Sequence, residues 1–180
     1  MPPHPRPLGP VPPGADPEAY DRLRRRVLWS MPSGLYLLGS RAGQRRNVMT
    51  LNWATQLATE PKLVGVAVER QALTHQLVSE GGAFCLMILG REERPLVRRF
   101  TKPAQADLEA STLGGVAFRD GLSGAPVLER ALAYLDCQVR QRLELGSHTL
   151  FVGEVVDAGF QGPEGTPVLR MEDTRMSYGG

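Results

Sequence analysis

From Gly34 onward the chain alternates short apolar runs with polar or glycine-containing connections. The runs are rich in Val, Leu, Tyr and Thr, and their length and composition are typical of β-strands. They read GLYLLGS, NVMTLNWATQL, KLVGVAVE, AFCLMILG, ALAYLDCQVRQRLEL and HTLFVGEVV. The connections at residues 41–46, 60–62 and 146–147 predict turns between successive strands. The pattern therefore predicts a series of short strands over most of the chain.

The clearest alternation lies between Ala131 and Leu143. Positions 133, 135, 137, 139 and 143 are apolar, whereas positions 136, 138, 140 and 142 are polar. A period of two predicts a strand with one buried face. Another strand, expected over residues 148–156, follows Gly146-Ser147, and we expect the two strands to pair as a hairpin.

Three helices are expected beside these strands. Asp16 followed by Pro17 is a typical helix start, because the Asp side chain accepts from free amides of the first turn and Pro loses no hydrogen bond there. A helix is therefore predicted over residues 17–28, and two more over 72–80 and 91–100. Many strands with a few inserted helices predict a mainly β protein with an antiparallel barrel rather than a doubly wound sheet.

The ends and connections of the chain complete this outline. Residues 1–17 contain eight of the 15 prolines and little that could be buried, so residues 1–16 are expected to form a disordered tail. Residues 17–180 are expected to form a single domain. The glycine-rich stretches 114–124 and 159–167 are expected to be loops. Because no GxGxxG motif is present, a nicotinamide cofactor would not be held in a Rossmann fold.

Composition and charge exclude several classes of function. The net charge of +2 is small, and a solvated helix face explains the arginine run at 24–26, so nucleic-acid binding is not expected. Cys85 and Cys137 lie in apolar runs without zinc-ligand spacing, which predicts buried free thiols and no metal. No apolar stretch reaches the roughly 18 residues of a membrane span, and the N-terminus lacks the apolar core of a signal peptide. We expect no membrane contact and a cytoplasmic location.

Several segments resemble the flavin reductase family in their order and spacing. They are Met31-Pro32-Ser33-Gly34, Asn47-Val48-Met49-Thr50-Leu51-Asn52-Trp53, Glu60-Pro61-Lys62-Leu63-Val64, Glu69-Arg70-Gln71-Ala72-Leu73-Thr74-His75, Val97-Arg98-Arg99-Phe100 and the run Gly146 to Val155. The resemblance extends from about residue 27 to the end of the chain. It implies a homodimeric, FMN-binding split β-barrel, although some members of the family use FAD. Asn52 and Trp53 stand where many members have small hydroxyl residues.

A flavin needs polar partners for its ring edge and an apolar wall for its ring face. On the strand expected around residue 50, Asn47, Thr50 and Asn52 offer amides and a hydroxyl, with Met49 and Leu51 between them. The alternative is the polar outward face of an edge strand. With the resemblance, the flavin interpretation is favoured.

The flavin phosphate needs cations or amide donors, and the loop at residues 69–74 leads into a helix whose N-terminus offers both free amides and a positive dipole end. Thr74 as a helix cap and Arg70 as a solvated side chain are the alternatives. The residues expected near the flavin or its phosphate in these segments are Glu69, Arg70, Gln71, Thr74, His75, Arg98, Arg99 and Phe100.

His148 is the candidate catalytic residue, because the resemblance implies a histidine beside the flavin where reduced nicotinamide stacks. Hydride transfer needs proximity and stacking more than an acid or a base. The first hypothesis is an NAD(P)H-dependent flavin reductase that supplies reduced flavin to a partner monooxygenase or to a bound acceptor. The alternatives are a flavoredoxin-like electron carrier with tightly bound FMN, and a split-barrel module without flavin.

Overall fold

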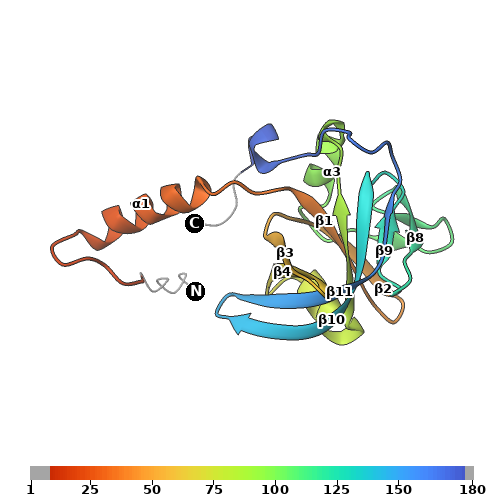
Figure 1. Cartoon of the computed structure of the whole chain (residues 1–180), viewed down its shortest axis with the longest axis horizontal. Helices are drawn as coiled ribbons and strands as arrows, with labels where there is room; N and C mark the ends of the chain where they lie inside the picture. The colour runs from red at the N-terminus through yellow and green to blue at the C-terminus, as the bar shows by residue number, and fades with distance from the viewer. Residues whose placement is uncertain (1–8, 177–180) are drawn as a thin grey trace. The chain divides into compact units, whose positions relative to one another are not determined.

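The computed structural model describes residues 9–176, which divide into two compact units. One unit, residues 33–174, holds every strand, and the other contains the helix α1 (Pro17–Trp29) (Figure 1). Residues 1–8 of the expected tail lie outside the described residues, and residues 9–16 contain no helix or strand. The single domain expected over residues 17–180 stays a prediction.

Helix α1 begins where the sequence predicts. Oδ1 of Asp16 accepts a hydrogen bond from the amide of Ala19 at 2.8 Å, and Pro17 occupies the first turn. No residue of α1 is buried. Arg24 and Arg25 both pair with Asp21, at 2.6 and 3.3 Å, so the arginine run is a solvated, ion-paired helix face as expected.

Seven antiparallel strands form the main sheet, in the order β2-β1-β5-β10-β11-β4-β3. Their bounds are β1 (Tyr36–Ala42), β2 (Arg45–Leu51), β3 (Ala54–Thr59), β4 (Lys62–Glu69), β5 (Ala83–Ile88), β10 (Ala133–Leu145) and β11 (His148–Phe160). Every one of these pairs is antiparallel. The mainly β, antiparallel class predicted from the sequence is confirmed, and the arrangement is consistent with a split barrel.

A second sheet contains four short strands, in the order β6-β7-β8-β9. They are β6 (Ala106–Asp107), β7 (Thr112–Leu113), β8 (Val116–Asp120) and β9 (Pro126–Leu128). The prediction of a loop over residues 114–124 was therefore wrong for residues 116–120, which form β8. Val116 and Phe118 are 4% and 8% exposed, so two inward-facing side chains suffice to hold β8 although glycines lie on both sides of it.

Helical segments lie between the strands much as predicted. They are α2 (Leu73–Gly81), the short 3-10 helix η1 (Arg91–Glu93), α3 (Arg94–Arg99) and a second 3-10 helix η2 (Met171–Asp173). The single helix expected over residues 91–100 is thus divided in two, with Pro95 in the first turn of α3. Within the described residues, no helix is long and apolar enough to cross a membrane.

The hairpin of β10 and β11 is present, but its faces differ from the predicted alternation. Register shifts lie between Asp136 and Cys137 and between Val139 and Gln141. A bulge adds one residue to a strand and moves the following side chains to the other face. Asp136 lies before both shifts and is fully buried, and its carboxylate accepts hydrogen bonds from the amide and the hydroxyl of Ser123. Leu143 follows the second shift and is 56% exposed. The prediction of one continuous buried face was wrong for this reason.

The core fills the space enclosed by the main sheet. Its central cluster comprises Leu38, Leu51, Val64, Val66, Val68, Val78, Phe84, Leu86, Cys137 and Phe151. Cys85 and Cys137 are buried and unpaired, which confirms the predicted free thiols. Burial raises the pKa of both thiols, that of Cys137 to about 12.

Candidate functional site

The start of β11 lies beside the loop that leads from β4 into α2. Glu69 and His148 are directly opposite each other across β4 and β11. The amide of Arg70 donates to the carbonyl oxygen of Ser147 at 3.0 Å. The loop at residues 69–74 and the hairpin end at 147–149, both selected from the sequence, are therefore neighbours.

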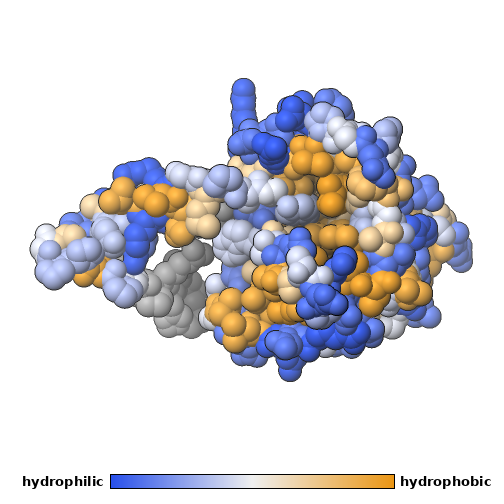
Figure 2. Space-filling view, in the orientation of Figure 1, coloured by the Kyte–Doolittle hydropathy of each residue, from blue (hydrophilic) through white to orange (hydrophobic). Residues whose placement is uncertain are grey.

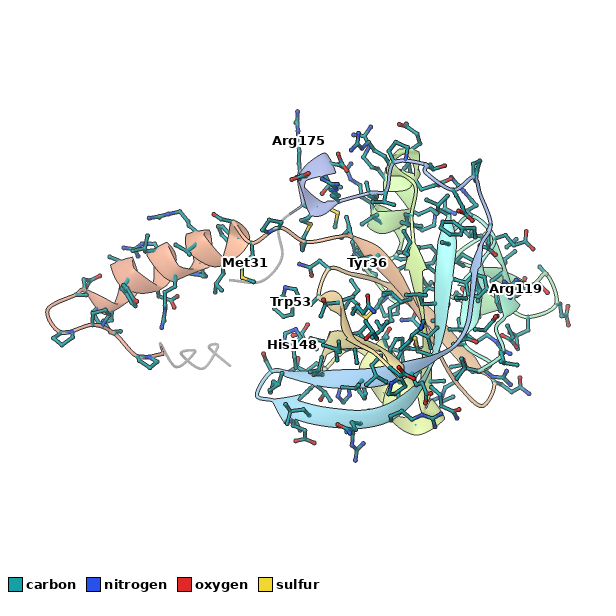
Figure 3. All side chains as sticks on the ribbon, viewed as in Figure 1. Met31, Tyr36, Trp53, Arg119, His148 and Arg175 are labelled. Atoms are coloured by element: carbon teal, nitrogen blue, oxygen red, sulfur yellow. The ribbon has the colours of Figure 1, made fainter. Side chains whose placement is uncertain are left out.

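His148 lies on the face of the sheet opposite to the core. Successive strand residues alternate between faces, and the next residue, Thr149, points inward with 3% exposure. The Nδ1 atom of His148 lies 2.8 Å from Oγ of Ser147 in a hydrogen bond. The indole of Trp53 lies beside the imidazole, with 4.8 Å between ring centroids and a tilt of 54° (Figure 3). His148 is thus contacted from two sides on an outward face.

The N-terminus of α2 has a local geometry that suits an anion. Ala72 occupies the N-cap position and has no side-chain acceptor, so the first-turn amides donate to no capping side chain at that residue. Arg70 and Gln71 are exposed immediately before it. Amides and the dipole of a helix start favour negative charge there. Thr74 does not cap the helix, which removes that alternative.

Asn47 joins this helix to β2. Its Nδ2 donates to Oγ1 of Thr74 at 2.9 Å, and its Oδ1 accepts from the amide of Ala104 at 2.9 Å. Asn47 is 2% exposed and Thr74 is 1% exposed. The alternative of a polar outward face therefore does not apply to Asn47, because its side-chain amide forms hydrogen bonds inside the protein.

The end of β2 is joined to α3 in a similar way. Oγ1 of Thr50 donates to the carbonyl oxygen of Val97 at 2.6 Å. The backbone amide of Thr50 donates to the carbonyl oxygen of Phe100 at 2.9 Å. Leu51 and Asn52 are 6% and 8% exposed, and Met49 packs against the core cluster. These residues hold α3 against the edge strand of the sheet.

Arg98 and Arg99 lie at the C-terminal end of α3. Both are exposed at the end of the helix. Nη1 of Arg99 donates to the carbonyl oxygen of Gly114 at 3.0 Å. Phe100 is fully buried behind them. Arg99 therefore also holds the segment that leads into β8.

His75 links α2 to β11. Its Nε2 lies 2.8 Å from Oγ1 of Thr149, and its ring centroid lies 5.3 Å from that of Phe151. Burial, followed by the charge of Arg70, lowers the pKa of His75. The imidazole accordingly links the helix to the strand that carries His148, and burial favours its neutral form.

The structure thus brings most of the sequence-selected residues into one connected region. Asn47 connects β2 to α2, His75 connects α2 to β11, and Thr50 connects β2 to α3. Sequence reasoning missed the contacts that Trp53 and Ser147 make with His148. An aromatic residue directly after a polar strand end was the available signal for Trp53.

A cavity of about 420 Å³ lies elsewhere on the same unit. It is bordered by residues 90–93, 129–132 and 161–167. None of the residues selected from the sequence lines it.

Residues 28–179 match the family model described as flavin reductase like domain. The chain is 29% identical over 135 residues to a high molecular weight rubredoxin of Moorella thermoacetica, covering 74% of this chain but 58% of that protein. It is 33% identical over 134 residues to a ferric-chelate reductase (NAD(P)H) of Archaeoglobus fulgidus, covering 73% of this chain and 78% of the relative.

Two solved structures are similar over most of their length. The NADH:FAD oxidoreductase of Streptomyces globisporus C-1027 has a TM-score of 0.69 and 30% identity, covering 84% of this chain and 89% of that one. The styrene monooxygenase flavin reductase of Pseudomonas putida S12 has a TM-score of 0.65 and 27% identity, covering 78% and 88% of the two chains.

Proposed function

Because the chain belongs to the flavin reductase-like domain family, we propose that it binds a flavin and catalyses hydride transfer from NAD(P)H to that flavin. The observation that carries the proposal is the position of His148, opposite Glu69 and beside the loop that enters α2. A phosphate-binding helix start and an outward-facing imidazole then border one site. FMN is the expected flavin and FAD the alternative.

The chemistry of the residues around α2 fits a flavin phosphate. The helix start has no side-chain cap, and Arg70 and Gln71 are exposed before it. Arg98, exposed at the end of α3, is assigned to the phosphate from its chemistry, because the planar fork of a guanidinium suits phosphate oxygens. When bound, the flavin supplies the electron-accepting ring for hydride transfer. The protein's part is to hold that group and orient it.

Three side chains support this site from inside the protein. Asn47 and Thr74 hold the start of α2 against β2, and Thr50 holds the end of α3 against the same strand. Met49, Leu51 and Asn52 lie along β2 or at its end and would line the site from that side. We assign these six residues to positioning and to the wall of the site.

His148 is assigned to the nicotinamide side of the site. Its imidazole lies on the outward face with Trp53, away from the core. Hydride transfer depends on the stacking and distance of two rings, so a planar group at this position can align the nicotinamide without moving a proton.

The outward face around His148 is also the proposed homodimer interface. Large hydrophobic side chains are exposed on it: Trp53 at 37%, Leu57 at 45%, Leu143 at 56% and Leu145 at 50%. Figure 2 shows hydrophobic side chains gathered at the free end of the β10–β11 hairpin. Contiguous exposed apolar surface of this kind marks an interface, and a twofold dimer would bury the same patch on both subunits. The site would then be completed by the partner.

A flavoredoxin-like electron carrier is the second candidate. The match to part of a high molecular weight rubredoxin favours it, because the same domain there is a portion of a longer chain. A partner monooxygenase is proposed for the reductase, given the similarity to a styrene monooxygenase flavin reductase. The proposal includes a cytoplasmic location, since two unpaired thiols suit a reducing compartment.

The proposal is tested by the absorbance spectrum of the purified protein, followed by addition of NADH or NADPH with FMN or FAD. Multiple turnovers of nicotinamide that depend on added flavin would support the reductase. Tightly bound flavin without nicotinamide turnover would favour the carrier. A protein that neither binds flavin nor oxidises nicotinamide would refute both.

A further inference from the structure

The imidazole of His148 is contacted by two residues, one adjacent to it in the sequence and one distant from it. Ser147, its neighbour in the chain, reaches Nδ1 at 2.8 Å. Trp53 precedes His148 by 95 positions in the chain, and its ring centroid lies 4.8 Å from that of the imidazole (Figure 3). One contact is a directed hydrogen bond and the other is a ring contact, so together they restrict both rotation and tilt.

The backbone holds Trp53 at this place. Its carbonyl oxygen accepts from the amide of Ala67 at 2.9 Å, which fixes the link between β2 and β3 against β4. His148, on β11, pairs with Glu69 on β4, the strand that also carries Ala67. Ala67 and Glu69 share the outward face of β4 because they are two residues apart. The backbones that carry both rings are thus attached to one strand, β4.

We propose that Trp53 is a positioning residue that, with Ser147, holds the imidazole of His148 in a single orientation for turnover. The inference rests on the proposed function, because it assigns Trp53 an effect on hydride transfer through His148. Trp53 is 37% exposed, so its indole can act on this surface without being a part of the core.

The expected effect follows from rotamer freedom. Without the indole, fewer contacts hold the His148 side chain in one of its three staggered χ1 wells, and equal occupation of the three would lower the productive fraction by about threefold. Loss of the Ser147 bond would remove a second restraint on the ring. We therefore expect kcat to fall by about 3- to 10-fold in Trp53→Ala, with the larger value if the ring tilt also changes.

The first experiment measures kcat, KM for NAD(P)H and the flavin Kd in Trp53→Ala, Trp53→Phe and Ser147→Ala. Trp53→Phe keeps a ring beside the imidazole and should retain most of the turnover, which also guards against a folding defect in Trp53→Ala. Phe160→Ala is the matched control, because Phe160 is an aromatic residue 59% exposed at the other end of β11. A loss of flavin affinity in Trp53→Ala with unchanged kcat at saturating flavin would overturn the proposal, since Trp53 would then be a flavin contact.

The second experiment observes the imidazole directly. The chain has three histidines, so ¹⁵N-histidine labelling gives a spectrum that single His→Ala variants can assign. Trp53→Ala and Ser147→Ala should shift the ring resonances of His148 and leave those of His75 in place. Unchanged His148 resonances in Trp53→Ala would overturn the positioning role even if turnover fell.

The two experiments separate this inference from the proposed function. Normal turnover in His148→Ala would refute the role of His148 in hydride transfer, and with it the effect of Trp53 on turnover. The scalar couplings that report χ1 of His148 would still decide whether Trp53 orients the imidazole, because loss of the indole ring current shifts the resonances even without reorientation. Reduced turnover in both His148→Ala and Trp53→Ala, with shifted resonances in the latter, is the expected result.

Discussion

The side chain of Asn47 donates from Nδ2 to Oγ1 of Thr74 at 2.9 Å, while its Oδ1 accepts from the amide of Ala104 at 2.9 Å. Asn47 is 2% exposed, so water cannot replace either bond. One amide group therefore joins β2, α2 and the segment that follows α3. The start of α2, to which we assign phosphate binding, depends on this connection.

Asn47→Ala should lower the free energy of unfolding by about 1–3 kcal/mol, because it leaves buried polar groups without their partner. It should also weaken flavin binding, since the start of α2 loses its attachment to β2. Urea unfolding and a flavin titration measure the two effects. Thr55→Ala, at an exposed position on β3, is the control and should change stability little. Equal stability of Asn47→Ala and the unmodified protein would contradict the prediction.

Gly39→Ala should destabilise the barrel, because a Cβ atom there would lie 2.1 Å from the carbonyl oxygen of Pro126. That oxygen belongs to the backbone of β9 and cannot rotate away, so β1 and β9 must separate. We expect a loss of about 1–3 kcal/mol in thermal or urea unfolding. Gly90→Ala is the matched control, because its nearest neighbour would be 3.6 Å away. Similar unfolding of the two variants would show that the close approach is unimportant.

Leu143→Glu should convert a dimer into a monomer. Leu143 is 56% exposed on the outward face that also carries His148, and a carboxylate there would be buried unpaired in a twofold interface. Light scattering coupled to size-exclusion chromatography measures the mass. Leu122→Glu, 74% exposed in the turn between β8 and β9, should leave the mass unchanged. A monomeric parent protein, or a dimer that survives Leu143→Glu, would argue against this interface.

Asp120 should contribute stability that disappears in acid. A hydrogen bond from Arg46, with the charges of Arg46 and Arg41, holds the pKa of Asp120 below its ordinary value against the opposing effect of burial. Because the pKa is lower in the folded protein, Asp120 stabilises the fold at pH values above its unfolded pKa of about 3.9. This stabilisation is lost as the pH falls through the folded pKa.

The stability difference between the unmodified protein and Asp120→Asn should accordingly be largest near neutral pH and shrink below about pH 4. Urea unfolding as a function of pH measures it. Glu164→Gln, in the exposed loop after β11, is the control for loss of a surface carboxylate. A difference that stays constant across the pH range would exclude the Arg46 interaction as its source.

Cys85 and Cys137 should not react with thiol reagents in the native protein. Both are fully buried, and burial raises the pKa of each thiol, so little thiolate is present and reagents have no access. Ellman's reagent should label neither thiol at neutral pH and both after unfolding in urea. Rapid labelling before unfolding would show that the sheet opens around β5 or β10.

The class of the fold and most of its elements could be predicted from the amino-acid sequence, because these depend on local rules. Asp16 and Pro17 specify the start of α1 through the first-turn amides, and Gly146-Ser147 places the β10–β11 turn between two alternating runs. The resemblance also selected the loop before α2 and His148, which lie side by side in the structure.

Tertiary structure decided which faces are buried and which distant residues meet. A bulge in the β10–β11 hairpin turns Leu143 outward, and Ser123 donates hydrogen bonds to the buried Asp136. A strict period of two predicts neither outcome. The partners of Asn47 and the contact of Trp53 with His148 join segments far apart in the chain. Strand register and packing bring such residues together, and neither follows from the local order of side chains.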